Sequence, residues 1–375
     1  MAKETMTSEE RLWAAIRLEK PDRVPIAPLM STPAAATLLG LDSAEVYANG
    51  EAQLDAEIKA FDEFGGWDGV IPTPVMADFM RLGFKVRVPG ESENVKELQT
   101  LEMENLKIED YDIIAETGWN RFLHDHLALR INDMKPEEVT SVLNDYFALT
   151  AKGLAAVRER GAAAIFPVWN EMPFFLFSLA RSMVKFTEDL YYRPEQVERA
   201  LKVAVPEWIK TSIDVCKASG VMIACCVEER AGAFFYPLKV FEHFWWPYTM
   251  QIVDAFWSEG IVAWFHLDTC WDKNIPYFKQ LPRGSAIIDL DGTTDIFAAK
   301  EVLRNHLCIA SDVHPTLLSL GKPEEVEAYC KKVIDEVGRD GGLILSTGCT
   351  VPGAVKPENF RAMIETGKNY ELSKK

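Results

Sequence analysis

Short, almost wholly apolar runs alternate with amphipathic helical runs along this chain, and this alternation limits the fold more than any other feature of the sequence. Continuous apolar runs are typical of strands buried on both faces, whereas apolar residues at i, i+3, i+4 and i+7 are typical of helices. Strands are expected at residues 24–29, 69–71, 162–168, 221–227, 261–267, 286–290, 307–313 and 342–346. Helices between them are expected, for example, at 237–259, 295–305 and 323–337. Eight strands alternating with helices predict an α/β fold, and a (β/α)8 TIM barrel rather than an open doubly wound sheet.

Two additions to this barrel are expected. Thr7 and Glu10 have the spacing of a capping box, which predicts a helical extension at the N-terminus. Residues 80–135 are longer than an ordinary strand-to-helix connection and predict an insertion or lid after the second strand. Because no linker, repeat or low-complexity tract interrupts residues 1–375, we expect a single domain. The sequence contains neither a dinucleotide fingerprint after a strand nor a phosphate-binding loop.

Composition narrows the class of partner. Lys and Arg number 40 and Asp and Glu number 57, so the formal net charge is −17. Such a surface repels phosphate backbones and anionic lipids, and we expect neither a nucleic-acid nor a membrane partner. No apolar stretch reaches the roughly 18 residues that span a bilayer, and the N-terminus lacks the apolar core of a signal sequence. The seven cysteines show no disulfide spacing, which favours a cytoplasmic location.

Polar side chains of ligand type follow the ends of the predicted strands. In a barrel of this kind the active site lies where strands end and their loops begin. The residues concerned are Trp169, Asn170 and Glu171 after the third strand, Glu228 after the fourth, His266 and Asp268 after the fifth, Asp289 and Asp291 after the sixth, Asp312 and His314 after the seventh, and Cys349 after the eighth. Such groups are costly to bury without partners, so their convergence at one rim predicts an enzyme.

Three of these side chains are candidate zinc ligands. Glu228, His266 and Cys349 supply the carboxylate, imidazole and thiolate that zinc prefers, and three protein ligands leave a fourth position open for chemistry. Each has an alternative interpretation that the sequence leaves open. His266 is also explained as a hydrogen-bonded wall residue, Cys349 as a small residue in a turn, and Glu228 as the ion-pair partner of Arg230.

Motifs over the whole chain match those of a known family. In the N-terminal part they are Ser-Glu-Glu-Arg at 8–11, Lys-Pro-Asp-Arg-Val-Pro at 20–25 and Trp-Asp-Gly-Val at 67–70. In the C-terminal part they are Phe-His-Leu-Asp at 265–268, Leu-Asp-Gly-Thr-Thr-Asp at 290–295, Ser-Asp-Val-His-Pro at 311–315, Ser-Thr-Gly-Cys-Thr-Val-Pro-Gly at 346–353 and Pro-Glu-Asn-Phe at 357–360. With these motifs the chain resembles the uroporphyrinogen decarboxylase superfamily and, within it, the corrinoid-dependent methyltransferases.

Departures from the family pattern indicate the reaction. The resemblance implies that a true decarboxylase carries Arg-Gln-Ala-Gly-Arg-Tyr after the first strand, whereas residues 27–33 here contain no cation, so decarboxylation is the least expected activity. Members that methylate thiols carry a His-x-Cys…Cys zinc pattern; His266 and Cys349 match its outer positions, but Asp268 replaces the middle cysteine. A carboxylate makes the site harder and favours activation of oxygen over sulfur.

The resemblance therefore implies a zinc-dependent methyltransferase of the O-demethylase type. It would move a methyl group from a small methoxylated substrate, an aromatic ether, to the Co(I) corrinoid (cobalamin) of a partner protein. The zinc ligands would be Glu228, His266 and Cys349, with Asp268 either a fourth ligand or a partner of His266. Transfer from a methyl-corrinoid to a thiol, or a non-catalytic binding barrel, are the alternatives.

Further roles are assigned by position. Asp268, Asp312 and His314 are the candidate catalytic residues, the last two as a proton relay. The candidate substrate-binding residues are Trp169, Asn170, Glu171, Phe235 and Tyr236, which would stack against a ring or hydrogen-bond its substituents. The run 237–259 contains two adjacent tryptophans that suit either the core or a dimer surface, so a homo-oligomer stays open.

Overall fold

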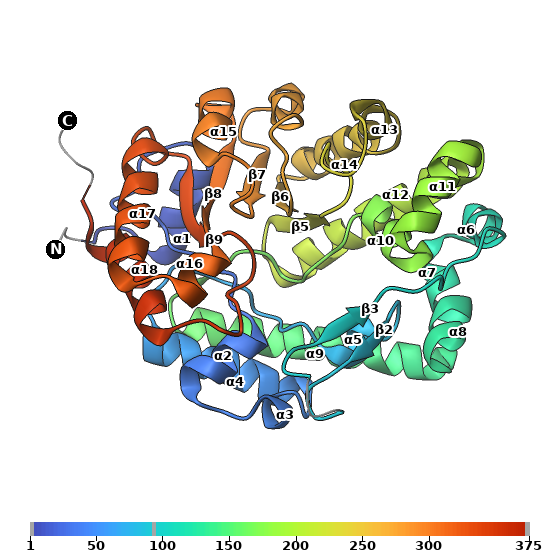
Figure 1. Ribbon diagram of the computed structural model, residues 1–375, viewed down its shortest axis with the longest axis horizontal. Helices are drawn as coiled ribbons and strands as arrows, with labels where there is room; N and C mark the ends of the chain where they lie inside the picture. The colour runs from blue at the N-terminus through green and yellow to red at the C-terminus, as the bar shows by residue number, and fades with distance from the viewer. Residues whose placement is uncertain (1–3, 92–94, 372–375) are drawn as a thin grey trace.

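A five-stranded parallel sheet forms the largest ladder in the computed structural model, which describes residues 4–91 and 95–371 (Figure 1). Its strands are neighbours in chain order: β5 (Ile223–Glu228), β6 (Val262–Leu267), β7 (Ala286–Leu290), β8 (Cys308–Val313) and β9 (Leu343–Thr347). All four pairings are parallel, and the assigned residues of β5, β6, β7 and β9 are buried. The predicted α/β class with buried parallel strands is therefore confirmed.

The first and third predicted strands are much shorter than expected, whereas the second is found within one residue of its predicted bounds. β1 (Gly69–Val70) pairs in parallel with β4 (Ala163–Ala164), and the run 24–29 makes only a bridge between Ile26 and Leu345 of β9. Proline explains the loss of regular ladder, because residues 25, 28 and 167 have no N–H to donate. The prediction of full strands at 24–29 and 162–168 was wrong in this respect.

Single backbone contacts continue the arrangement where no ladder forms. The amide of Gly69 donates to the carbonyl of Ile26 at 3.0 Å, and Glu171 forms a parallel bridge with Val227 of β5. The eight predicted positions thus follow one another in chain order. Side chains from them pack together in one buried cluster, which includes Trp264 and Ile287, and Leu12 of α1 (Ser8–Ile16) joins it. The predicted capping box at the start of α1 is present.

Helices surround the strands on their outer side (Figure 1). The longer ones are α4 (Gly50–Phe64), α9 (Pro136–Glu159), α12 (Pro194–Ser219), α14 (Trp246–Ser258), α17 (Pro323–Glu336) and α18 (Pro357–Asn369). The shorter ones are α2 (Thr32–Leu39), α3 (Ser43–Val46), α5 (Ala77–Met80), α10 (Pro173–Arg181), α11 (Met183–Tyr192), α13 (Leu238–Phe244), the 3-10 helix η2 (Ile275–Gln280), α15 (Ile296–Leu303) and α16 (Pro315–Leu320). The helix predicted at 237–259 is broken between α13 and α14, because Pro247 stands in the first turn of α14. Its adjacent tryptophans, Trp245 and Trp246, are both buried in the core of the chain.

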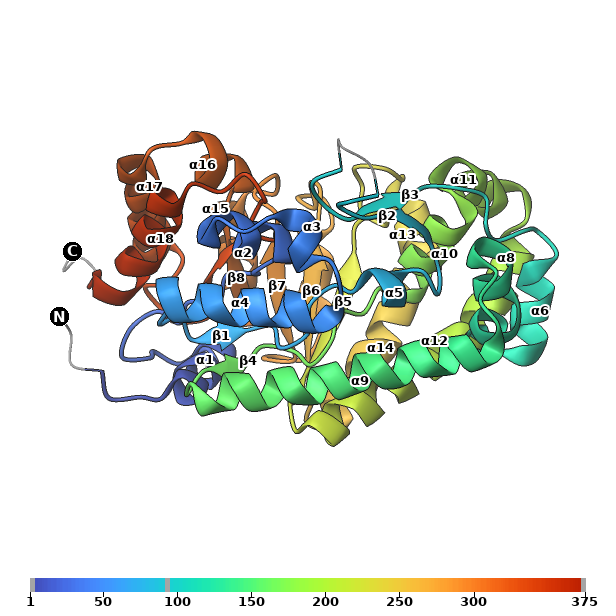
Figure 2. The same ribbon diagram turned by 90° about the horizontal axis from the view of Figure 1, so that it is seen from below.

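The segment predicted as an insertion has its own small elements. It contains the antiparallel pair β2 (Lys85–Arg87) and β3 (Gln99–Leu101), then α6 (Asp110–Thr117), α7 (Trp119–Phe122), the π-helix η1 (Leu123–Leu127) and α8 (Ala128–Asn132). Figure 2 shows α6 and α8 to one side of the strands, past β5, with the long helices α9 and α12 running between the two regions. Among the described helices, none combines the length and apolar character needed to cross a membrane.

Candidate metal centre

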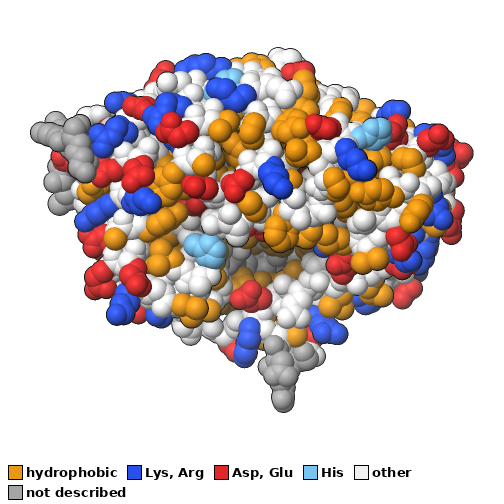
Figure 3. All heavy atoms as spheres, turned by 45° about the horizontal axis from the view of Figure 1, so that its top comes forward, with side chains coloured by type: hydrophobic (Ala, Val, Ile, Leu, Met, Phe, Trp, Pro, Cys, Tyr) orange, Lys and Arg blue, Asp and Glu red, His pale blue; other side chains and the backbone are white. Residues whose placement is uncertain are grey.

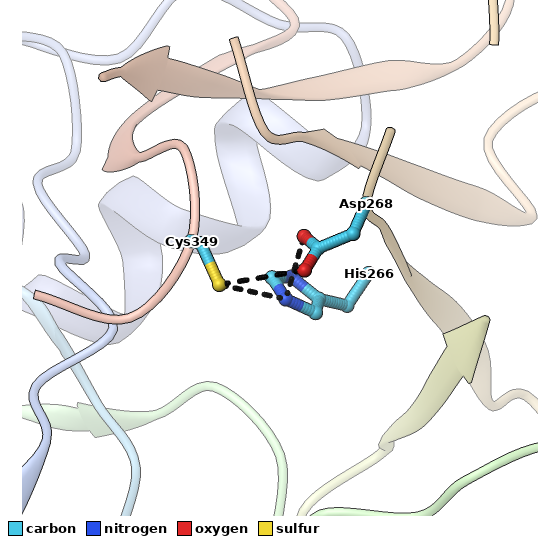
Figure 4. Close-up of side chains that lie close together, drawn as sticks. All are labelled: His266, Asp268 and Cys349. Carbon is cyan, nitrogen blue, oxygen red and sulfur yellow. Dashed lines mark hydrogen bonds and ion pairs between the residues drawn. The ribbon is translucent and has the colours of Figure 1, made fainter. Parts of the chain in front are cut away.

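Three ligand-type side chains meet at the carboxyl ends of β6 and β9. His266 is the penultimate residue of β6, Asp268 follows that strand, and Cys349 lies two residues beyond the end of β9 (Figure 4). The Nε2 atom of His266 lies 3.7 Å from the Sγ atom of Cys349 and 3.4 Å from Oδ1 of Asp268. Oδ2 of Asp268 lies 3.7 Å from the same Sγ. Among the described residues, these three form the group whose ligand atoms all lie within 4.8 Å of one another.

These distances suit a single zinc ion. Ligands held tetrahedrally at about 2.0–2.3 Å from one zinc are roughly 3.4–3.6 Å from each other, close to the three separations observed. Oδ1 of Asp268 is also buried and receives no hydrogen bond from the described residues. The imidazole of His266 is 3.4 Å away from it, without a hydrogen bond. A metal ion between the three side chains would give this buried oxygen a partner at bonding distance, so the donor set fits a metal ion.

Asp289 of β7 fixes the orientation of His266. Its Oδ2 lies 2.7 Å from Nδ1 of His266 and also accepts the indole N–H of Trp264 at 3.0 Å. A carboxylate at Nδ1 holds the proton there and leaves the Nε2 lone pair for a metal. Burial opposes the charged imidazolium, but the charge of Asp289 raises the pKa of His266 well above its ordinary value. Because a metal binds only the neutral imidazole, this shift sets metal binding in competition with protonation of the ring.

The loops around the cluster are held in unusual backbone conformations. Thr269 has φ of +70°, which a β-branched residue rarely adopts, and its N–H donates to Oδ2 of Asp291 at 2.7 Å. Gly348 approaches the backbone of Asp291 so closely that a Cβ would lie 2.6 Å from its carbonyl oxygen. A glycine before Cys349 thus lets the eighth loop come close enough to present the thiol.

The structure does not bring Glu228 to the cluster, which corrects the predicted ligand set. Its carboxylate accepts the N–H groups of Arg230 at 3.0 Å and Ala231 at 3.1 Å, and the indole N–H of Trp245 at 2.8 Å. It is fully buried on the outer side of β5. Side chains alternate along a strand, and Glu228 is in register with Leu267, one position out of phase with His266. Glu228 therefore organises the loop after β5.

Glu229, which the sequence analysis missed, is the glutamate whose charge interacts with those of Asp268 and His266. Burial and the charge of Asp268 raise its pKa to about 7, and the charges of His266 and Glu171 also act on it. Strand parity was the available signal, because Cys225 and Val227 belong to the same interior cluster as Trp264. Continuing that alternation by two residues leads to Glu229.

Asp312 and His314 lie apart from the three ligand atoms. Asp312 is buried and accepts the hydroxyl of Tyr329 at 2.6 Å; burial raises its pKa to about 6. His314 is the N-cap of α16, and its Nδ1 accepts the N–H of Thr316 at 3.1 Å. Their proposed proton relay receives no support from a hydrogen bond between them in the described part of the chain.

The predicted substrate residues divide into two groups. Trp169 lies beside the cluster, with its ring 5.6 Å from that of His266 in an edge-to-face arrangement. Asn170 and Glu171 are beside it, where Asn170 donates to the hydroxyl of Ser212 at 2.8 Å and burial raises the pKa of Glu171. By contrast, Phe235 and Tyr236 pack between the loop after β5 and the helices α10 and α11. The ring of Phe235 contacts Phe234, and the Tyr236 hydroxyl lies 2.9 Å from that of Thr187.

Comparison with known proteins identifies the family to which this chain is similar. A family model described as uroporphyrinogen decarboxylase (URO-D) matches residues 130–370. The chain is 23% identical to methylcobamide:CoM methyltransferase MtbA of Methanosarcina acetivorans over 368 residues. This match covers 97% of this chain and 98% of that protein.

Two shorter matches agree with this family. The chain is 30% identical over 142 residues to methylcobamide:CoM methyltransferase MtbA of Methanosarcina mazei, which covers 38% of this chain and only 39% of that relative's length. It is 30% identical over 82 residues to uroporphyrinogen decarboxylase of Methylococcus capsulatus, covering 22% of this chain and 23% of that one.

A solved structure of a methyltransferase from Methanosarcina mazei superimposes with a TM-score of 0.70 at 15% identity. It covers 97% of this chain and 98% of that one. At this identity the likeness concerns the fold.

Proposed function

We propose that this chain is a zinc-dependent methyltransferase. The premise is that it belongs to the uroporphyrinogen decarboxylase family, in the branch of the corrinoid-dependent methyltransferases. It transfers a methyl group from a methoxylated substrate, an aromatic ether, to the Co(I) corrinoid of a partner protein. The observation that carries this proposal is the cluster of His266, Asp268 and Cys349, with ligand atoms 3.4–3.7 Å apart.

The donor set supports an oxygen-bonded methyl group. A zinc ion held by one nitrogen, one oxygen and one sulfur is a harder Lewis acid than one held by two thiolates, and would polarise an ether oxygen. Around it, Asp289 keeps the Nε2 lone pair of His266 directed at the site, and Trp169 shields that side of the ring from water.

Glu229 completes the reaction as a proton donor. When the corrinoid cobalt takes the methyl carbon, the bond from that carbon to oxygen breaks and the oxygen keeps the electron pair. The oxygen then needs a proton. A carboxyl group whose pKa is about 7, next to Asp268, holds one near neutral pH and can release it.

Metal content is the first test of this function. We expect about one zinc per chain in the wild type, and loss of it in both His266→Ala and Cys349→Ala. Cys270→Ala is the matched control, because Cys270 is also half-buried near the centre but its thiol lies 3.3 Å from Asp272. Zinc that persists in both ligand variants would overturn the assignment.

Methyl transfer is the second test, with free cob(I)alamin as acceptor and 4-methoxybenzyl alcohol as donor. Formation of methylcobalamin, followed by its absorbance, is expected in the wild type and absent from Cys349→Ala. A Glu229→Gln variant should bind zinc normally and lose turnover, because the amide has no proton of suitable acidity to give.

A thiol acceptor is the second candidate, since the full-length relative is named a methylcobamide:CoM methyltransferase. The same protein would then demethylate methylcobalamin with 2-mercaptoethanesulfonate and leave the ether intact. Asp268 in place of a thiolate ligand argues against this direction.

A further inference from the structure

A second, unassigned set of polar groups lines a cavity beside the metal centre. This cavity of about 190 Å³ lies between the loops that follow the first, second, third and eighth strand positions. Its lining includes residues 30–33, 73–75, Trp169 and residues 350–353. All of these follow strand ends, so the cavity belongs to the same rim as the metal ligands. The face drawn in Figure 3 is hollowed near its centre, with an acidic side chain at the edge of the hollow.

Two lining residues join the cavity to the metal centre. Trp169 presents one side to the cavity, and its ring lies 5.6 Å from that of His266. Thr350 lines the cavity and is bonded directly to Cys349. A 150 Å³ cavity is known to hold a benzene ring, so a molecule with one ring fits in this cavity, beside the two residues that join it to the metal centre.

Glu57 of α4 places a carboxyl group in this cavity. Its side chain is only 8% exposed, and the one hydrogen bond that it receives from the described residues comes from the hydroxyl of Thr32, at 2.7 Å to Oε1. Gln53 holds that hydroxyl from the other side, with Nε2 at 3.2 Å. Oε2 is therefore left without a protein donor. Because Oε2 is not among the fully buried atoms, solvent in the cavity reaches it, and a ligand that enters the cavity can contact it there.

The other charged residue among the described lining residues is also acidic. Glu97 lines it and packs against Gly353, where a Cβ would lie 2.2 Å from Oε1 of Glu97. Lys, Arg and His are absent from the described lining residues. Tyr47 and Trp169 add aromatic rings, whose faces attract cations. The lining therefore supplies the acidic group of Glu97 and no positive charge that could pair with an anionic substrate.

We propose that the methyl donor binds in this cavity through a positively charged ammonium group that pairs with Glu57, opposite the end that reaches the metal centre. This inference rests on the proposed function for the fate of the methyl group, and it excludes donors that carry a carboxylate or sulfonate. Glu57 is then a specificity residue, because it contacts the substrate without touching the bond that breaks.

Ammonium binding is coupled to a proton. Burial raises the pKa of Glu57 to about 8, so this carboxyl group is neutral at pH 7 when the cavity is free. Glu97 and Tyr47 are the other titratable groups of the described lining, and neither supplies positive charge near neutral pH. An incoming ammonium therefore releases the Glu57 proton, and its affinity rises with pH from about 6 to 8.

Three probes of equal size and different charge test the inference by calorimetry on the full-length protein. They are 4-methoxybenzylamine, 4-methoxybenzyl alcohol and 4-methoxybenzoate. We expect the amine to bind at least about tenfold more tightly than the alcohol, and the benzoate to bind most weakly. Amine binding should release close to one proton at pH 7, measured in buffers of different ionisation enthalpy.

Glu57→Gln removes the charge and keeps the size of the side chain. It should weaken amine binding by about 10- to 100-fold, abolish proton release and leave alcohol binding almost unchanged. Glu45→Gln is the matched control, since Glu45 lies on the neighbouring helix α3 but is exposed and lies outside the cavity lining. Benzoate binding as tight as amine binding in the wild type would overturn the inference without recourse to any variant.

Failure of this inference is distinguishable from failure of the proposed function. Methyl transfer from the alcohol with no preference for the amine would sink the charge assignment and leave the methyltransferase standing. If amine binding depends on Glu57 but none of the three probes transfers its methyl group to cob(I)alamin, the charge assignment stands and the methyltransferase proposal fails.

Discussion

The two ends of the barrel both bury charged side chains, but they do so in opposite ways. At the N-terminal end, Arg11 of α1 contacts Asp22 at 2.6 Å and Asp68 at 2.5 Å, and Arg23 contacts Asp68 at 2.6 Å. Backbone N–H groups of Thr5, Met6 and Ile26 satisfy the remaining carboxylate lone pairs. Despite burial, Arg11 and the N–H groups of Thr5 and Met6 hold the pKa of Asp22 well below its usual value.

At the C-terminal end the carboxyl groups outnumber their partners. Asp268 and Asp289 share the single imidazole of His266, and Oδ1 of each makes no hydrogen bond with the described residues. Burial raises the pKa of Glu229 and of Glu57, which lie near them on the same rim. The comparison separates two kinds of buried charge. Carboxylates that are paired with arginines stabilise the fold, whereas carboxyl groups without enough positive partners are candidates for binding a cation from outside the chain.

Removing a metal ligand is the largest expected change and should affect activity alone. Cys349→Ser should lower methyl transfer by about 10³-fold or more, because a hydroxyl replaces the thiolate. The free energy of unfolding of the metal-free protein should change by less than about 0.5 kcal/mol, as for a half-buried site. Urea unfolding and methylcobalamin formation measure the two effects. A large loss of stability would show that this end also holds the fold together.

Breaking the paired cluster should have the converse effect. Arg11→Met leaves Asp22 and Asp68 buried with fewer partners and should destabilise the protein by about 3–5 kcal/mol. Arg17→Met, on the exposed end of the same helix, should cost less than about 0.5 kcal/mol. Thermal and urea unfolding provide the measurement. Zinc content of whatever fraction stays folded should equal that of the wild type.

Asp289→Asn tests the support of the metal ligand. The amide holds the His266 proton less firmly, and zinc affinity should fall by about 10- to 100-fold, measured by competition with a chromophoric chelator. Glu228→Gln should leave zinc affinity unchanged, because Glu228 faces away from the cluster. Equal losses in the two variants would contradict the assignment of Asp289 and Glu228 to separate roles.

Glu57→Gln should change how stability depends on pH. The folded-state pKa of Glu57, about 8, lies above its ordinary value of 4.5. Its protonated form is therefore favoured by folding, and that contribution is complete below pH 4.5 and lost as the pH rises through 8. Relative to the wild type, the variant should gain about 1 kcal/mol per pH unit between pH 6 and 8, measured by urea unfolding at each pH. Parallel pH profiles would show that the carboxyl group is already ionised.

Local patterns gave a good account of the later strands and of two ligands. The apolar runs that form β5 to β9 contain no proline. The strands predicted from the apolar pattern therefore agree with the hydrogen-bonded strands of the structure. His266 and Cys349 follow such runs and were identified at the rim before the fold was known. In the first half, Pro25, Pro28 and Pro167 interrupt hydrogen bonding that an apolar pattern alone does not reveal.

The sequence by itself determined the alternation of strands and helices, the collection of ligand-type residues at one rim and the pairing of His266 with Cys349. Only the tertiary structure decided that Glu228 points away from the cluster of His266, Asp268 and Cys349, because a shift of one residue turns a side chain to the other face of the sheet. It also decided the surroundings of Glu57, which lies on the buried stripe of α4 between Leu54 and Phe61. The apolar pattern of α4 predicts that one face of this helix is buried. It does not predict what buries Glu57, because the loops that enclose this side chain come from four distant parts of the chain.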